Sequence, residues 1–183
     1  FLTQLNKIIK SCTSAFGEYN CSKAKLEAEN FFWKVFADNY LEIVKNRVYN
    51  GTKKEKASAY YTLYQSLLTI LKLMAPITPF ITEEIYQEHL KMHEKAKSIH
   101  VSDWPSKIKL KSFKSDSAIC NKMIEIISFA RHEKSKAQKS IKAEIILTLP
   151  KNDAKILKKL IPDIKSVTSA KELKHGGLKI EFV

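Results

Sequence analysis

Two groups of basic residues have the types and spacing needed to bind a polyanion. One group surrounds Asn50-Gly51, and the other lies near the end of a helix expected over 116–137. They comprise Lys45, Arg47, Lys53 and Lys54, followed by Lys56, and then Arg131, Lys134 and Lys136, followed by Lys139. Their ammonium and guanidinium groups can neutralise phosphates and release counterions. Arg47 and Arg131 are the sharper candidates, because a guanidinium makes bidentate contacts to a phosphate or a guanine edge.

Aromatic residues offer a second kind of contact, since unpaired bases of RNA stack on aromatic rings. Trp33 is the candidate stacking residue, with burial in the core as the alternative. Phe32 and Phe36 lie on the apolar face of the same expected helix, where core packing is favoured. A similar stripe, Tyr60, Tyr61 and Tyr64, is also expected to pack.

Spacings typical of catalysis or metal binding occur without the partners that such chemistry needs. Asp38 and Glu42 lie four residues apart, but no His, Cys or Ser nucleophile is in register with them. We expect them to pair with Lys34 or Lys45. His89 and His93 have the spacing of a metal pair but lack a third ligand. The sequence therefore predicts no catalytic residue and no metal site.

The net charge of +13 favours a polyanionic partner, with nucleic acid ahead of an anionic membrane. A lysine-rich surface that only confers solubility is the alternative. The excess is small up to residue 104, with 14 basic and 11 acidic residues. The excess is larger over 105–141, with nine basic and three acidic residues, and over 142–183, with nine basic and five acidic residues. We therefore expect the second half to supply most of the attraction.

Cysteine use and hydropathy point to the cytoplasm. The three cysteines form neither a CxxC motif nor an even set, which fits a reducing compartment. No apolar run reaches the roughly 18 to 20 residues of a membrane span. The sequence opens at Phe1 inside an amphipathic pattern and without Met, which suggests a piece of a longer protein.

Helical periodicity dominates the first 96 residues. Apolar residues predict one helix near the start, and a second from an N-cap at Ser22 to about Tyr49, stopped by a left-handed Asn50-Gly51. A third helix is expected over 54–74, and a fourth from the Thr78 N-cap to about Lys95. Short connections favour an antiparallel bundle.

After an extended segment at 97–114, the pattern becomes mixed. A helix is expected over 116–137, with Ile119, Met123, Ile126, Ile127 and Ala130 inward. Alternation predicts a strand over 143–149, a short helix through 156–161, a strand over 164–168 and a last strand after Gly176-Gly177. The predicted fold is mostly α: a helical bundle (1–96), a linker (97–114) and a basic α+β subdomain (115–183).

Three ordered motifs resemble the C-terminal, anticodon-binding portion of the valyl-tRNA synthetases, in an archaeal-like form. They are residues 29–49 (ENFFWKVFADNYLEIVKNRVY), 73–86 (LMAPITPFITEEIY) and 98–105 (SIHVSDWP). The Asp38-x-Tyr40-Leu41-Glu42 pattern favours the valyl over the isoleucyl form. The family's His-x-Gly-His and Lys-Met-Ser-Lys-Ser elements are absent, and 134–140 (KSKAQKS) matches the second only superficially.

The resemblance implies a monomeric tRNA-binding module for valine isoacceptors. From their chemistry, the residues that we expect to contact the tRNA are Lys45, Arg47, Lys53, Lys54, Arg131, Lys134, Lys136 and Trp33. It also implies that the full-length class I ligase uses ATP and Mg²⁺, whereas this piece needs no cofactor and is inactive alone. The same module of an isoleucyl-type enzyme and a non-catalytic helical adaptor are the alternatives.

Overall fold

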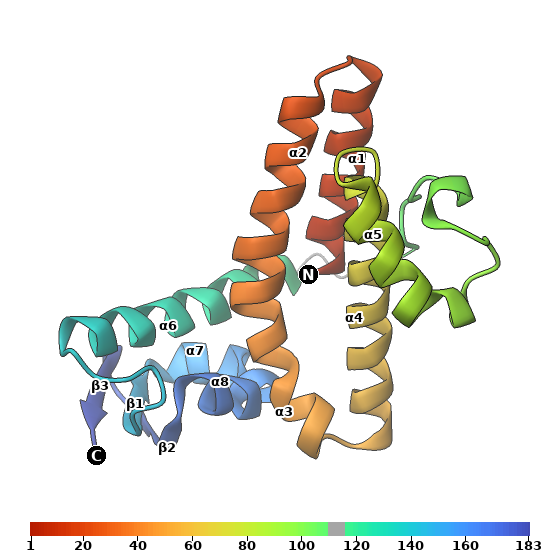
Figure 1. Ribbon diagram of the computed structural model, residues 1–183. Coiled ribbons are helices and arrows are strands. Elements are labelled where there is room, and N and C mark those ends of the chain that lie inside the picture. Colours follow the sequence, from red (N-terminus) through yellow and green to blue (C-terminus); the bar gives the residue numbers. More distant parts are fainter. Residues whose placement is uncertain (110–115) are drawn as a thin grey trace. The chain divides into compact units, whose positions relative to one another are not determined.

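A computed structural model describes residues 1–109 and 116–183 of the chain, as two compact units (Figure 1). Unit 1 comprises Phe1–Leu41 and Ala57–Lys111, and unit 2 comprises Glu42–Lys56 and Ser112–Val183. A helical bundle and a small α+β part are both present, which confirms the predicted fold class. The predicted boundaries at residues 96 and 114 stay a prediction.

Unit 1 is built from helices that pack through small and apolar side chains. They are α1 (Leu2–Gly17), α2 (Cys21–Asn30) with its π-helical continuation η1 (Phe31–Leu41), α4 (Lys53–Met74, from Ala57), α5 (Pro79–Ile85), η2 (Tyr86–Leu90), η3 (Lys91–His93) and η4 (Ile99–Val101). Cys12 and Ala15 of α1 meet Ala24 and Ala28 of α2 and Leu73 of α4 in one buried cluster. Side chains this small let the helices approach closely.

The turn between α1 and α2 corrects the predicted N-cap. Asn20, not Ser22, caps α2, and its side chain accepts a hydrogen bond from the Lys23 N–H at 3.0 Å. Tyr19 adopts a left-handed backbone (φ 56°). The Tyr19 N–H donates to the Phe16 carbonyl, and the Asn20 N–H donates to the Ala15 carbonyl. This is the Schellman pattern of a helix end.

The predicted fourth helix begins as expected, with Thr78 at the N-cap and Pro79 in the first turn. Thr78 does not cap with its side chain, because its hydroxyl donates back to the Met74 carbonyl. The helical path continues through η2 and η3 and ends at His93, close to the predicted Lys95.

Glu83 explains why the second and third sequence motifs occur together. Its carboxylate accepts hydrogen bonds from the Ser98 hydroxyl and the Ile99 N–H, both at 2.9 Å, and from the Gln87 amide at 2.6 Å. Partial burial raises the pKa of Glu83, but these hydrogen bonds outweigh it, so that the pKa lies below its usual value. The ionised carboxylate thus holds the 98–99 turn against α5.

The segment after Val101 is also attached to unit 1. The Asn6 side chain exchanges two hydrogen bonds with the backbone of Ile108, at 2.8 and 2.9 Å. Trp104 donates its indole N–H to the Thr13 hydroxyl and packs edge-on against Phe16. Residues 104–108 of the predicted linker therefore lie along α1; its residues 110–114 fall outside the described residues.

We predict that Glu83→Gln destabilises unit 1 most near neutral pH. A carboxyl group with a lowered folded-state pKa contributes stability above its unfolded pKa and loses it as the pH falls through the folded-state value. The difference between wild type and variant should therefore shrink below about pH 4, as thermal melts across pH would record. Glu84→Gln, at the exposed neighbour, is the control; a pH-independent difference for Glu83→Gln would contradict the expectation.

Unit 2 joins one early helix to the C-terminal half of the chain. Its elements are α3 (Glu42–Asn50), the first residues of α4, α6 (Asp116–Lys136), β1 (Ile145–Leu149), α7 (Lys151–Ile156), η5 (Lys158–Leu160), α8 (Ile161–Thr168), β2 (Ala170–His175) and β3 (Lys179–Phe182). The core combines Ile43 of α3 with side chains of α6, β1 and α8. As predicted, Met123, Ile126, Ile127 and Ala130 are buried, and Ile119 is packed beside them.

The sheet has the order β2-β1-β3, with β1 parallel to β2 and antiparallel to β3. The predicted first and last strands are confirmed, but the strand predicted over 164–168 is wrong: these residues belong to α8, and the strand follows at Ala170–His175. A parallel pair needs a crossover connection, and α7 to α8 provide it. Pro162 in the first turn and buried Ile164 and Thr168, four apart, suit a helix.

The connection between α3 and α4 also differs from the prediction. No glycine among the described residues has a positive φ, so Gly51 is not a left-handed stop. A Cβ atom at Gly51 would instead lie 2.4 Å from the Arg47 carbonyl oxygen, so the close approach requires glycine. Thr52 and Glu55 form a reciprocal capping box at the start of α4.

Helix α6 ends in another Schellman motif, with Gln138 in the left-handed conformation (φ 52°). The Gln138 N–H bonds to the Ser135 carbonyl, and the Lys139 N–H to that of Lys134. We predict that Gln138→Gly stabilises unit 2 by roughly 0.5–1 kcal/mol, because glycine adopts this conformation without a Cβ penalty. Urea denaturation is the measurement. Ser135→Gly, inside the helix, should destabilise; equal losses for both variants would contradict the prediction.

Candidate nucleic-acid interface

The end of α3 and the start of α4 present several of the predicted cations at the surface of unit 2. Lys45, Lys53 and Lys54 are exposed. Lys45 pairs with Glu42 at 2.6 Å, one of the two partners expected from the sequence. The capping box between Thr52 and Glu55 fixes the turn that separates these lysines. The turn can therefore present ammonium groups in a defined arrangement.

Arg47 has a role that the sequence did not reveal. Its Nε and one terminal nitrogen both donate to Asp163 Oδ2, at 2.9 and 2.5 Å. The Asp163 side chain is only 3% exposed and lies on α8, 116 residues further along the chain. Because a buried carboxylate needs a charged partner, Arg47 is a structural contact between α3 and α8. One third of its side chain remains exposed.

We predict that Arg47→Met destabilises unit 2 by about 3 kcal/mol, because it leaves the Asp163 carboxylate buried without its partner. Hydrogen exchange of the α8 and β1 amides would report the loss for this unit alone. Lys45→Met removes the same charge from the same helix but breaks only an exposed pair, so its effect should stay below about 1 kcal/mol. Equal effects of the two variants would contradict a structural role for Arg47.

The second group of cations, in the last turns of α6, contains both exposed and buried side chains. Arg131 is half-buried and Lys136 is exposed. Lys134, in contrast, is 1% exposed, and its ammonium donates to the carbonyls of Ile141, Ala143 and Thr168 at 2.7, 2.7 and 2.8 Å. All three of its protons are used, and burial lowers its pKa. The expectation that Lys134 offers a surface contact is therefore corrected.

Among the aromatic residues, Trp33 has the exposure that a stacking contact requires. Its side chain lies in η1, is 61% exposed and packs edge-on against Phe32. Phe36 is buried in the core, as expected. The predicted packing of the tyrosine stripe is wrong for Tyr60 and Tyr61, which are largely exposed on α4, whereas Tyr64 lies against the core of α4 and η2.

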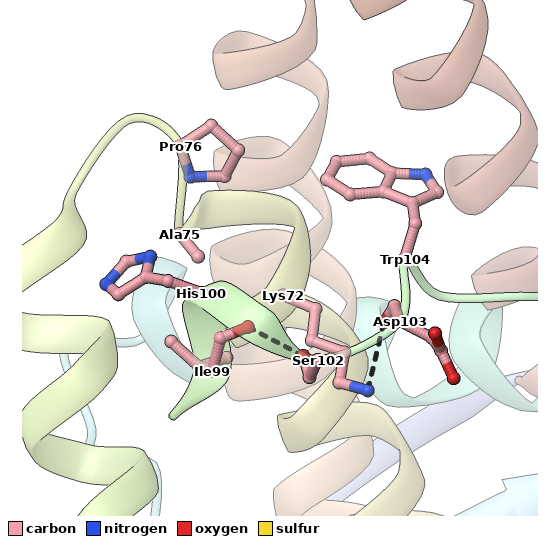
Figure 2. A pocket seen from close by; sticks show the side chains of 8 residues that line it. All are labelled: Lys72, Ala75, Pro76, Ile99, His100, Ser102, Asp103 and Trp104. Carbon is pink, nitrogen blue, oxygen red and sulfur yellow. Dashed lines mark hydrogen bonds between the residues drawn. The ribbon is translucent and has the colours of Figure 1, made fainter. Parts of the chain in front are cut away.

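Unit 1 contains a small cavity of about 120 Å³ between the end of α4 and the 99–104 segment (Figure 2). Its lining includes Lys72, His100 and Trp104. Lys72 donates to the Asp103 carbonyl at 3.1 Å, and the Ser102 hydroxyl donates to the Ile99 carbonyl at 2.6 Å. The first bond holds the segment on α4 and the second closes its own 99–102 turn, so these polar groups serve the fold. A second, apolar hollow lies between η1 and α4, and its lining has no charged side chain.

The residues with catalytic or metal-binding spacing are not assembled into a site. Within residues 1–109 and 116–183, no group of three His, Cys, Asp or Glu side chains could hold a metal ion. His93 packs edge-on against Tyr64, and His89 lies beside Glu88. The described helices also include none with the length and apolar character that crossing a bilayer requires.

Sequence reasoning missed two roles, and only one had a local signal. Lys134 continues the buried series Met123, Ile127 and Ala130 at helical spacing, which marks it as inward-facing. Asp163 lies far from Arg47 in the sequence, and no spacing rule connects them. Periodicity could therefore have separated Lys134 from Lys136, but not found the ion pair.

Comparison with known proteins identifies the family. The anticodon-binding domain of tRNA ligases matches residues 1–149, which is most of the chain, and the chain belongs to this family. It is 36% identical over 180 residues to a valine–tRNA ligase of Orientia tsutsugamushi, covering 93% of the chain and 21% of that protein. The valine–tRNA ligase of Ehrlichia ruminantium (strain Gardel) is 40% identical over 155 residues, covering 79% of the chain and 18% of that protein. That of Haloarcula marismortui is 42% identical over 105 residues, covering 57% of the chain and 11% of that protein. The chain thus spans about a fifth of the first relative.

Proposed function

We propose that this chain binds the anticodon arm of valine tRNA as part of a valine–tRNA ligase. The observation that carries the proposal is the similarity to valine–tRNA ligases along nearly the whole chain. The exposed cations of unit 2 support it, because phosphate neutralisation supplies much of the affinity of proteins for nucleic acids. The aminoacylation itself, with ATP and Mg²⁺, would belong to a catalytic domain elsewhere in a monomeric, cytoplasmic enzyme.

Binding by this module is positional. Lys45, Lys53, Lys54, Arg131 and Lys136 contact phosphates and set the register of the tRNA, since backbone contacts fix orientation without reading sequence. Trp33 stacks on an unpaired base, at roughly 1–3 kcal/mol for such a contact. Arg47 supports the surface through its ion pair with Asp163, and the exposed part of its side chain contacts a phosphate. Residues 1–96 would supply shape and anticodon reading, and the basic subdomain at 115–183 affinity.

The direct test is a binding titration of the 183-residue chain across about 50 to 200 mM salt. The ligands are valine tRNA, the same tRNA with a substituted anticodon, and a scrambled hairpin. We expect the tightest binding for valine tRNA and a steep decrease of every affinity with salt. Equally feeble binding to all three RNAs without salt dependence would contradict the proposal and favour a helical adaptor. Isoleucine tRNA is added as a further ligand, and a preference for it over valine tRNA would indicate the isoleucyl form.

Two variants separate backbone contacts from base reading. Lys53→Ala/Lys54→Ala should weaken binding to all three RNAs alike and reduce the slope of log K against log salt by about 1 per phosphate contact. Trp33→Ala should reduce the preference for the native anticodon. Lys7→Ala/Lys10→Ala, at two exposed residues of α1, removes the same charge and should change neither quantity.

A further inference from the structure

The buried ammonium of Lys134 fixes the loop that follows α6. Two of its three acceptors, the carbonyls of Ile141 and Ala143, belong to this loop, and the third belongs to Thr168 at the end of α8. An ammonium that leaves water must be hydrogen-bonded to be tolerated, and here every donor has an acceptor. The loop is therefore tied to two helices of unit 2 through one side chain.

The loop also forms hydrogen bonds of its own. The Schellman motif at Gln138 defines its beginning, and the Ala143 N–H bonds to the Ser140 carbonyl at 2.9 Å near its end. The Lys142 N–H donates to the Ser140 hydroxyl at 3.2 Å. Together with Lys134, these bonds hold the backbone from residue 137 to 143 in one conformation.

Three exposed lysines lie in or directly beside this loop: Lys136, the last residue of α6, and Lys139 and Lys142 within the loop. In the described part of the chain, none of the three forms an ion pair with a carboxylate, whereas Lys122, Lys171 and Lys179 of the same unit all do. The nearby Glu144 already pairs with Lys171 at 2.6 Å. The charge of the loop is thus available to an external anion.

We propose that Lys136, at the end of α6, and the 137–143 loop form a preformed binding surface for the RNA sugar–phosphate backbone, and that Lys134 is its positioning residue. The proposal rests on the proposed tRNA binding and deepens it. Three lysines within seven residues suit consecutive phosphates of one strand, and a loop ordered before binding loses little entropy when it binds. Lys134 acts through the loop, because its ammonium has no proton left for a phosphate.

A double-mutant cycle on the 183-residue chain tests both parts. Lys139→Ala/Lys142→Ala should lower the affinity for valine tRNA roughly tenfold at low salt and reduce the salt slope by about 2. Lys134→Met should lower the affinity to a similar extent and accelerate hydrogen exchange of the 137–143 amides. Adding Lys134→Met to the double alanine variant should cause little further loss of affinity. Lys155→Ala/Lys158→Ala, at exposed lysines of the same unit, is the control.

The outcomes are distinguishable. Wild-type affinity and slope for Lys139→Ala/Lys142→Ala would overturn the loop surface, even if Lys134→Met failed to fold. Unchanged exchange in Lys134→Met, or losses that add fully in the combined variant, would overturn the positioning role. Failure of the wild-type chain to bind any RNA would instead refute the proposed function, with the exchange measurement still deciding whether Lys134 orders the loop.

Discussion

Unit 2 depends on the ion pair between Arg47 and Asp163. It joins α3, from the first third of the chain, to α8, near its end. Ile43 and Val44 of the same helix are buried, and Ile43 completes the core formed by α6, β1 and α8. The apolar contacts supply the stabilisation, whereas the charged pair specifies which face of α3 meets α8, because any other register would leave a carboxylate buried alone.

The same physical rule sorts the cations of this lysine-rich chain. A guanidinium or ammonium that faces the interior must find oxygen acceptors there, as Arg47 does at a carboxylate and Lys134 does at three carbonyls. Lysines such as Lys53 and Lys136 remain in water and are available to a polyanion. Net charge alone does not distinguish these two classes, because a buried, hydrogen-bonded cation and an exposed one contribute equally to the total.

Periodicity predicted most of the helices, because amphipathic spacing is a local property of the sequence. The apolar face with Phe32 and Phe36 and the inward face of α6 are both where it placed them. Periodicity failed over 164–168. The β-branched residues there favour a strand, but the parallel pairing of β1 and β2 requires a helical crossover between these two strands. β2 itself, Ala170–His175, has few strand-forming residues and forms because β1 pairs with it. The surface cations were predictable as a group, but the burial partners of Arg47 and Lys134 were not, since they come from tertiary contacts.

The discontinuity of unit 2 affects the order of events during synthesis. Arg47 is made 116 residues before Asp163, which corresponds to roughly 6 to 23 s at about 5–20 residues per second. Until α8 is made, α3 lacks the helix against which it packs in the folded chain, whereas the whole of unit 1 has been made by then. A nascent chain therefore carries an uncovered helix face for seconds, a natural point for a chaperone to bind and for aggregation to begin.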